Sequence, residues 1–161
     1  MIEEYLGFAK GEGAEREKEI VLDEFLRELF TKFPQEHLSL ASFSELQGAP
    51  VIWRPYAMKR ALTNIITNAL RYGKHVWFQG SLTPKMITLV FEDDGPSIPP
   101  NRRGDVFRPF VRLDESRNTE TGGYGLGLSI CQDIITAQGG SIFLEDSSKH
   151  GGLKVIVHLP I

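Results

Sequence analysis

The feature that most constrains this chain is the stretch MKRALTNIITNALRYG, residues 58–73. Asn64, Asn68 and Arg71 recur there at helical spacing, so they fall on one stripe of a helix. The apolar residues project to the opposite side: Leu62, Ile65, Ile66 and Ala69. Asparagine is a poor helix former, and a merely solvated face, the alternative interpretation, would more often carry Lys or Glu. The paired asparagines therefore favour a stripe that faces a ligand needing neutral oxygen donors, such as Mg2+.

The composition is that of one soluble globular domain, with 161 residues of which 41% are hydrophobic and 24% charged. A formal net charge of −3 argues against nucleic acid as a partner, because binding a phosphate backbone needs a basic surface. The single cysteine, Cys131, lies in an apolar helical stretch, which indicates a buried thiol rather than a reactive one.

Hydrophobic periodicity and turn residues predict a mixed, mostly antiparallel sheet with three main helices on one face, an α+β two-layer sandwich. The expected strands are residues 19–22, 37–43, 50–53, 75–81, 85–93, 141–146 and 152–159. The strands 75–81 and 85–93, joined by Leu82, Thr83 and Pro84, read as an antiparallel hairpin. The expected helices are residues 24–33, with Asp23 as N-cap, the stretch from about Pro55 to residue 73, and residues 125–138, which Gly139 and Gly140 terminate.

Two further segments bear on the organisation of the chain. Residues 1–13 read as the end of a helix followed by a charged, glycine-containing linker, which leaves residues 14–161 as the folded domain. Residues 95–125 hold many Gly, Pro and Arg residues and at most one short helix, near residues 101–107. A connection of that length is typical of a mobile functional segment.

Two places could carry binding chemistry. Gly123, Gly125 and Gly127 precede a helix, where free N–H groups and close backbone approach suit an anion; a glycine-rich hinge fits equally well. Asp93 ends an apolar strand and could accept a hydrogen bond from an exocyclic amine such as that of adenine, although such strand-to-turn junctions are often structural. Arg112 and other loop arginines are consistent with phosphate neutralisation or with simple solvation.

The order and spacing of four segments resembles one known family. NIITNALRYG, EDDGPSIP, VFRPF and GGYGLGLSI are similar to the N, G1, F and G2 boxes of the GHKL ATP-binding fold. The run from about residue 19 to 161 resembles the catalytic domain of a bacterial sensor histidine kinase of the EnvZ-like class. Residues 1–13 resemble the end of that family's second dimerisation helix.

The resemblance implies a role for each matching residue. Asn68 would coordinate the Mg2+ ion that bridges the ATP phosphates, with Asn64 lining the same cleft, and Arg71 would contact phosphate. Tyr72 would pack on the adenine, Asp93 would take the adenine amino group, and Gly95 would leave space beside the base. The implied catalytic residues are Asn64, Asn68 and Arg71. The implied nucleotide contacts are Asn68, Ala69, Leu70, Arg71, Tyr72, Asp93, Gly95, Arg112, Leu113, Gly123, Tyr124, Gly125, Leu126, Gly127 and Leu128.

Three departures from the family pattern are visible. Ser97 stands where the last glycine of the G1 box is expected, so the turn after the adenine would be stiffer. Tyr124 stands where the family often has Ser or Thr, and the lid from Arg112 to Tyr124 is slightly longer. These departures support an alternative, a degenerate GHKL domain that binds protein partners instead of nucleotide.

The residue four before Asn68 separates a kinase from an ATPase. GHKL ATPases such as gyrase carry there a Glu that activates water, whereas Asn64 cannot accept a proton. The implied reaction is therefore phosphoryl transfer to a nucleophile supplied from elsewhere. The chain's own histidines read as surface or strand residues, not phosphoacceptors: His37, His75, His150 and His158.

The resemblance finally implies the partners. The chain would bind Mg-ATP and donate the γ-phosphoryl group to a histidine on a dimerisation domain that it lacks, and a response regulator would follow. A GHKL serine kinase or anti-sigma factor is the other alternative. The full-length protein is expected to be an inner-membrane homodimer, with this part a cytoplasmic monomer that does not phosphorylate itself.

Overall fold

The computed structural model describes residues 15–42, 44–107 and 127–161. Within these ranges the chain forms seven strands and three α-helices. The strands are β1 (Lys18–Val21), β2 (Leu38–Ser42), β3 (Pro50–Trp53), β4 (Val76–Leu82), β5 (Met86–Asp93), β6 (Ser141–Asp146) and β7 (Leu153–Pro160). The α-helices are α2 (Leu22–Phe30), α3 (Pro55–Tyr72) and α5 (Gly127–Ala137). The predictions for residues 1–13 and for the lid lie outside the described residues.

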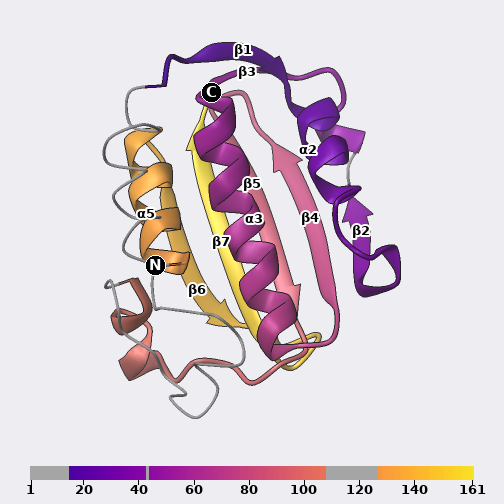
Figure 1. Cartoon of the computed structure of the whole chain (residues 1–161), viewed down its shortest axis with the longest axis vertical. Helices are drawn as coiled ribbons and strands as arrows, with labels where there is room; N and C mark the ends of the chain where they lie inside the picture. Colours follow the sequence, from indigo (N-terminus) through magenta and orange to yellow (C-terminus); the bar gives the residue numbers. More distant parts are fainter. Residues whose placement is uncertain (1–14, 43, 108–126) are drawn as a thin grey trace.

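Five strands make the main sheet, in the order β2-β4-β5-β7-β6. β2 runs parallel to β4, and the other neighbours are antiparallel, including the predicted β4–β5 hairpin. Burial alternates along β5 and β7, because one face of the sheet packs against the helices. Figure 1 shows α3 and α5 side by side on that face. The predicted two-layer α+β architecture is confirmed.

Two of the predicted strands do not join that sheet. β1 and β3 pair with each other in an antiparallel two-stranded sheet, with Lys18 opposite Trp53. Figure 1 shows this small sheet crossing one end of the helical layer. The amide of Leu22 then donates to the carbonyl oxygen of Ala49 (2.8 Å), which ties the start of α2 to the residue before β3.

The prediction that Asp23 caps α2 is wrong. The helix begins at Leu22, its N-cap is Val21, and no side chain caps it. Asp23 lies in the first turn, where its Oδ1 accepts a hydrogen bond from the amide of Gly48 (3.0 Å). The apolar side of α2 packs into the core: Leu26, Leu29 and Phe30 are buried, and Phe25 and Phe33 are partly buried against the same core.

α3 and α5 pack together and supply much of the core. The apolar face of α3 is fully covered, with Leu62 and Ile66 at 0% exposure. The Cys131 thiol of α5 is buried, and its Sγ contacts the carbonyl oxygen of Ala61 at 3.1 Å. Burial raises the pKa of this thiol far above its usual range, so it stays protonated, as expected of a structural cysteine. None of the described helices is long and apolar enough to cross a membrane.

The segment that follows β5 is fastened by short turns. The single short helix predicted near residues 101–107 is instead two 3-10 turns, η4 (Pro100–Arg102) and η5 (Asp105–Phe107). A hydrogen bond between Arg102 Nε and Asp105 Oδ2 (2.9 Å) connects the two turns. At the other end of the domain, Gly139 ends α5 with a φ of 84°, the left-handed conformation expected of a helix-terminating glycine.

Candidate functional site

The polar stripe predicted from residues 58–73 exists on α3. Asn64, Asn68 and Arg71 are all partly exposed, whereas Ile65 and Ala69 on the opposite face are buried. Pro55 is the first residue of the helix. Its missing N–H costs no hydrogen bond there, because the first amides of a helix have no partner within the helix. The stripe is therefore held by an 18-residue helix whose apolar side is fixed in the core.

The start of α3 is held by residues from both ends of the domain. The Glu15 carboxylate accepts hydrogen bonds from the amides of Tyr56 (3.0 Å) and Ala57 (3.1 Å). The Gln138 side chain, just beyond α5, accepts from the amide of Arg54 (2.9 Å). These acceptors satisfy amides that a helix N-terminus leaves without partners, so they fix the axis along which the asparagines are presented.

The start of α5 lies beside the polar stripe. The side-chain amide of Asn64 donates to the carbonyl oxygen of Gly127 across 3.5 Å, a long hydrogen bond. Gly127 is the first residue of α5, and a Cβ added to it would meet no atom of the described residues within 4 Å. The helix N-terminus predicted to receive an anion is thus next to the predicted catalytic stripe.

The end of α3 meets the end of β5. Asp94 Oδ1 accepts hydrogen bonds from the amides of Lys74 (2.7 Å) and His75 (3.1 Å), which follow α3 directly. A Cβ added to Gly95 would lie 2.5 Å from the carbonyl oxygen of Tyr72. Glycine is therefore required by close backbone packing, while space for a base beside Gly95 stays a prediction.

Asp93 is the most deeply buried charged side chain of this region, with 5% exposure. Its Oδ1 accepts from the amides of Gly95 (2.9 Å) and Leu153 (3.1 Å). Both hydrogen bonds fall on the same oxygen within the described part of the chain, so Oδ2 can accept from another group. Burial raises the pKa of Asp93, and the negative charge of Asp94 adds to the effect, although the two backbone hydrogen bonds oppose it.

The structure separates the predicted site residues into two kinds. Ala69 and Leu128 point into the core, and Leu70 is partly buried against it, so their contacts to a ligand would come through the backbone. Asn64 contacts Gly127 at the start of α5, and Tyr72 contacts Gly95, whose amide donates to Asp93 at the end of β5. Asn68 and Arg71 lie between Asn64 and Tyr72 on α3. Six predicted contacts lie outside the described residues: Arg112, Leu113, Gly123, Tyr124, Gly125 and Leu126.

Sequence reasoning missed residues that support the site from a distance. A Cβ on Gly152 would come within 2.2 Å of Asp93 Oδ1, so this glycine allows β7 to approach the carboxylate. Asp146 accepts hydrogen bonds from Ser97 and Arg103, which hold the segment after Asp93. The Gly-Gly pair before β7 could have indicated the close approach of Gly152 to Asp93. Nothing in the local sequence indicates that Asp146 contacts Ser97 and Arg103, which are more than forty positions earlier.

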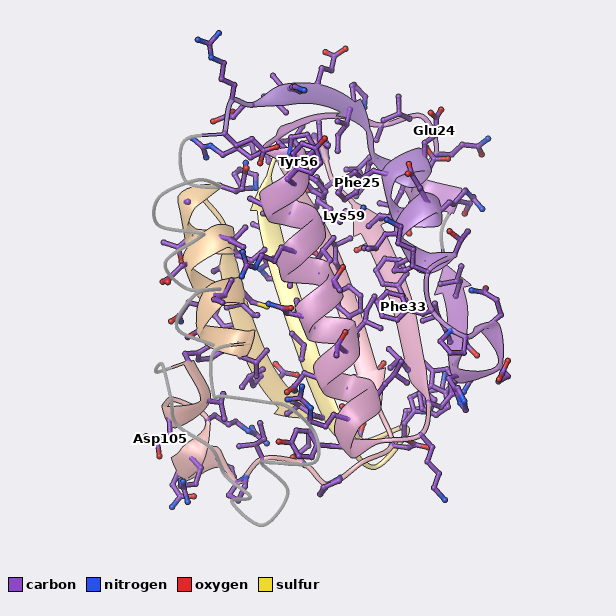
Figure 2. All side chains as sticks on the ribbon, in the orientation of Figure 1. Glu24, Phe25, Phe33, Tyr56, Lys59 and Asp105 are labelled. Atoms are coloured by element: carbon purple, nitrogen blue, oxygen red, sulfur yellow. The ribbon has the colours of Figure 1, made fainter. Side chains whose placement is uncertain are left out.

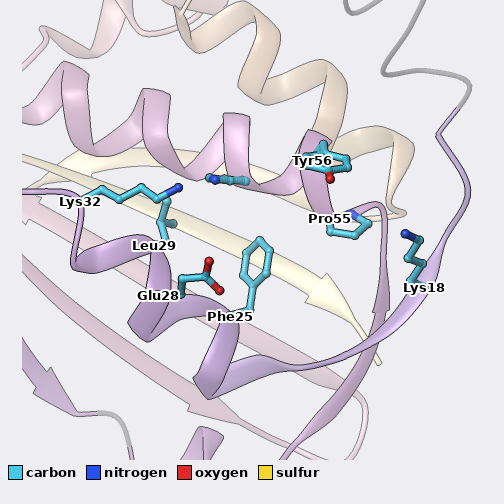
Figure 3. A pocket seen from close by; sticks show the side chains of 8 residues that line it. Lys18, Phe25, Glu28, Leu29, Lys32, Pro55 and Tyr56 are labelled. Carbon is cyan, nitrogen blue, oxygen red and sulfur yellow. The ribbon is translucent and has the colours of Figure 1, made fainter.

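A pocket of about 220 Å3 opens at the other end of α3. Figure 3 shows its lining, which comes from β1, α2, the turn after α2 and the start of α3: Lys18, Phe25, Glu28, Leu29, Lys32, Pro55, Tyr56 and Lys59. Figure 2 places Tyr56, Lys59 and Phe25 at this end of the domain. A rise of about 1.5 Å per residue puts Tyr56 roughly 20 Å from Arg71, so this pocket is separate from the polar stripe.

Comparisons with known proteins agree on one family. A family model described as histidine kinase-, DNA gyrase B-, and HSP90-like ATPase matches residues 54–161. The sensor histidine kinase CpxA of Escherichia coli strain K12 is 42% identical over 113 residues, which are 70% of this chain and 24% of CpxA. The chain thus spans about a quarter of the length of the curated relatives it matches.

Solved structures agree with this match. The histidine kinase domain of the E. coli osmosensor EnvZ is 31% identical, with a TM-score of 0.63 over 89% of this chain and 88% of that domain. Full-length ShkA, solved in complex with AMPPNP, gives a TM-score of 0.78 over 99% of this chain and 35% of ShkA. At 21% identity, ShkA supports the fold alone.

Proposed function

Because this chain belongs to the family of histidine kinase-, DNA gyrase B- and HSP90-like ATPases, we propose that it is the Mg-ATP-binding catalytic domain of a two-component sensor histidine kinase. Membership of the family implies ATP binding. One observation carries the proposal: the helix that bears Asn64, Asn68 and Arg71 contacts the start of α5 through Asn64 and the residue after Asp94 through Tyr72.

The residues present fit a nucleotide. Asp93 Oδ2 is an acceptor for the amino group of adenine, and Tyr72 at the end of α3 is an aromatic surface for the ring. Arg71, in the last turn of α3, is a donor for phosphate oxygens. The start of α5, as a helix N-terminus next to Asn64, favours negative charge in the same region.

The same residues fit Mg2+ carried by the nucleotide. The described part of the chain has no group of three or more His, Cys, Asp or Glu side chains that could hold a metal alone. Mg2+ is commonly held by one or two protein oxygens together with phosphates and water, and the Asn68 carboxamide oxygen suits it. When bound, the ion would neutralise charge on the phosphates; Asn68 would fix its position beside Arg71.

The acceptor of the phosphoryl group is proposed to be a histidine outside this chain. Asn64 occupies the position from which a Glu would activate water, and its carboxamide donates to Gly127 instead of taking a proton. Transfer then depends on positioning and charge neutralisation. The proposal also includes a dimerisation domain and a response regulator as partners, a lid from Arg112 to Tyr124, and a membrane-bound homodimer with this domain in the cytoplasm. These parts rest on the resemblance to sensor histidine kinases.

The fate of the γ-phosphate tests the kinase assignment. The isolated chain, incubated with Mg-ATP labelled at the γ-phosphate, should release phosphate far more slowly than about one per second, a typical enzyme turnover. It should also acquire no acid-labile phosphate, because none of the four histidines lies on a described α-helix, where the family's phosphoacceptor is expected. Rapid phosphate release would indicate an ATPase, and an acid-labile phosphoprotein would place the acceptor within this chain; either result would contradict the proposal.

A further inference from the structure

Ser97, the residue that departs from the glycine of related nucleotide sites, has a specific partner in this structure. Its Oγ donates to Asp146 Oδ1 across 2.5 Å. Asp146 is the last residue of β6, and Ser97 lies four residues after the end of β5. The hydrogen bond therefore joins the segment beside the proposed adenine site to the edge strand of the sheet.

Arg103 completes this contact. Its Nη2 donates to the same Asp146 Oδ1 (2.7 Å), and its Nε donates to the carbonyl oxygen of Ile98 (2.9 Å). Because Ile98 follows Ser97 directly, the interactions close a ring from Ser97 through Asp146 and Arg103 back to Ile98. We call Ser97, Arg103 and Asp146 the Asp146 cluster.

The cluster rests on a fixed support. Ser147, directly after Asp146, donates from its Oγ to Glu92 Oε1 on β5 (2.9 Å), and its amide donates to the carbonyl oxygen of Gly152 (2.7 Å). The end of β6 is thus attached to both β5 and the start of β7. The hydrogen bond from Ser97 lowers the pKa of Asp146, and Arg103 lowers it further. These effects outweigh burial, which raises the pKa, so the carboxylate is charged at neutral pH.

We propose that the Asp146 cluster positions the segment 94–98 for nucleotide binding, with Ser97 and Asp146 as positioning residues that act through Asp93 and Gly95. This inference rests on the proposed function. The segment has two other attachments, Asp93 to the amide of Gly95 and Asp94 to the amides after α3. A glycine at position 97 would lack the direct hydrogen bond to Asp146 and would leave only the link through Arg103. The serine therefore preorganises segment 94–98, which reduces the ordering cost of binding.

Four variants test the inference: Ser97→Ala, Ser97→Thr, Asp146→Asn and the control Glu145→Gln, an exposed carboxylate one residue earlier in β6. The affinity for Mg-ADP is measured by titration calorimetry, and hydrogen exchange of residues 94–107 is measured without nucleotide. Losing one hydrogen bond of about 0.5–1.5 kcal/mol corresponds to a Kd increase of about two- to tenfold for Ser97→Ala and Asp146→Asn. Ser97→Thr keeps the hydroxyl donor, so its affinity for Mg-ADP should equal that of the parent. The affinity of Glu145→Gln should also equal that of the parent.

The same measurements distinguish a positioning role of the Asp146 cluster from a general contribution to the stability of the fold. Positioning predicts faster exchange confined to residues 94–107, together with the weaker binding. The melting temperature should fall by no more than the few degrees that one hydrogen bond contributes. Equal affinities in all variants, or exchange that rises throughout the domain as the melting temperature falls, would overturn the inference while the parent still binds Mg-ADP. A folded parent that binds no Mg-ADP would overturn the proposed function, and the inference with it.

Discussion

Two adjacent aspartates at the end of β5 have opposite environments. Burial raises the pKa of Asp93, which means that its charged form is disfavoured in the folded state. For Asp94 desolvation is the largest single effect and raises the pKa. Hydrogen bonds from the amides of Lys74 and His75, one from its own amide and the charge of His75 together outweigh it, so the pKa of Asp94 is lowered. Asp94 stabilises the turn after β5 through its hydrogen bonds. The charged form of Asp93 destabilises the fold, but it lies where the proposed adenine amino group would bind.

The two residues should therefore respond differently to loss of their charge. Asp93→Asn should weaken Mg-ATP binding about 10- to 100-fold, because a charged acceptor is lost. Its melting temperature at pH 7 should not fall, since the asparagine oxygen can still accept from the amides of Gly95 and Leu153. The destabilising effect of the parent's charge is absent below pH about 4 and grows as pH rises through the raised pKa.

Asp94→Asn is the matched variant. A lowered pKa stabilises the fold above the ordinary value of about 4, and that contribution is lost as pH falls through the lowered pKa. Asp94→Asn should therefore melt below the parent at pH 7 and approach it on acidification. Thermal melts from pH 3 to 8 check both variants; parallel curves for Asp93→Asn and Asp94→Asn would contradict the assigned environments.

Among the elements, α3 determines the geometry of the site. Its apolar face packs in the core, its N-terminus is held by Glu15, and its C-terminus is held through Asp94. The helix is thus fixed at both ends as well as along its length. A displacement at its start would be carried to Asn68 and Arg71, because a helix of this length moves as a rigid body.

The attachment at the start of α3 can be tested alone. Glu15→Ala removes the acceptor of the Tyr56 and Ala57 amides, and loss of such a cap should lower the free energy of unfolding by about 1 kcal/mol. Glu17→Ala is the control: Glu17 forms a 3.6 Å ion pair with Arg54 at the surface, which should contribute well under 1 kcal/mol. Urea unfolding of both variants measures the difference, and equal losses would contradict a capping role for Glu15.

At the scale of the whole molecule, features with a local cause could be predicted from the sequence. The period of Leu62, Ile65 and Ile66 predicts which face of α3 is buried, and the Leu82–Pro84 turn predicts the β4–β5 hairpin. The resemblance to the catalytic domain of EnvZ-like sensor histidine kinases is confirmed by the family match and by the relatives.

Features that depend on distant partners could not be predicted. Asp23 has the sequence signature of an N-cap, but its carboxylate accepts a hydrogen bond from the amide of Gly48, which is twenty-five residues away. β1 pairs with β3 instead of joining the main sheet, and nothing in either four-residue strand specifies that choice. The sequence shows Ser97 only as a departure from the family's glycine. Its hydrogen bond to Asp146 could not be predicted, because the two residues are 49 positions apart.

The most direct test of the central claim is calorimetric titration of Mg-ATP into four chains: the parent, Asn68→Ala, Asp93→Asn and Thr67→Ala. Thr67 is the exposed neighbour of Asn68 on α3, so its variant controls for the helix surface. The account predicts binding by the parent and Thr67→Ala, and affinities at least about tenfold weaker for the other two. It also predicts that removing Mg2+ weakens the parent far more than Asn68→Ala. A folded parent that binds no Mg-ATP, or equal binding by all four chains, would contradict it.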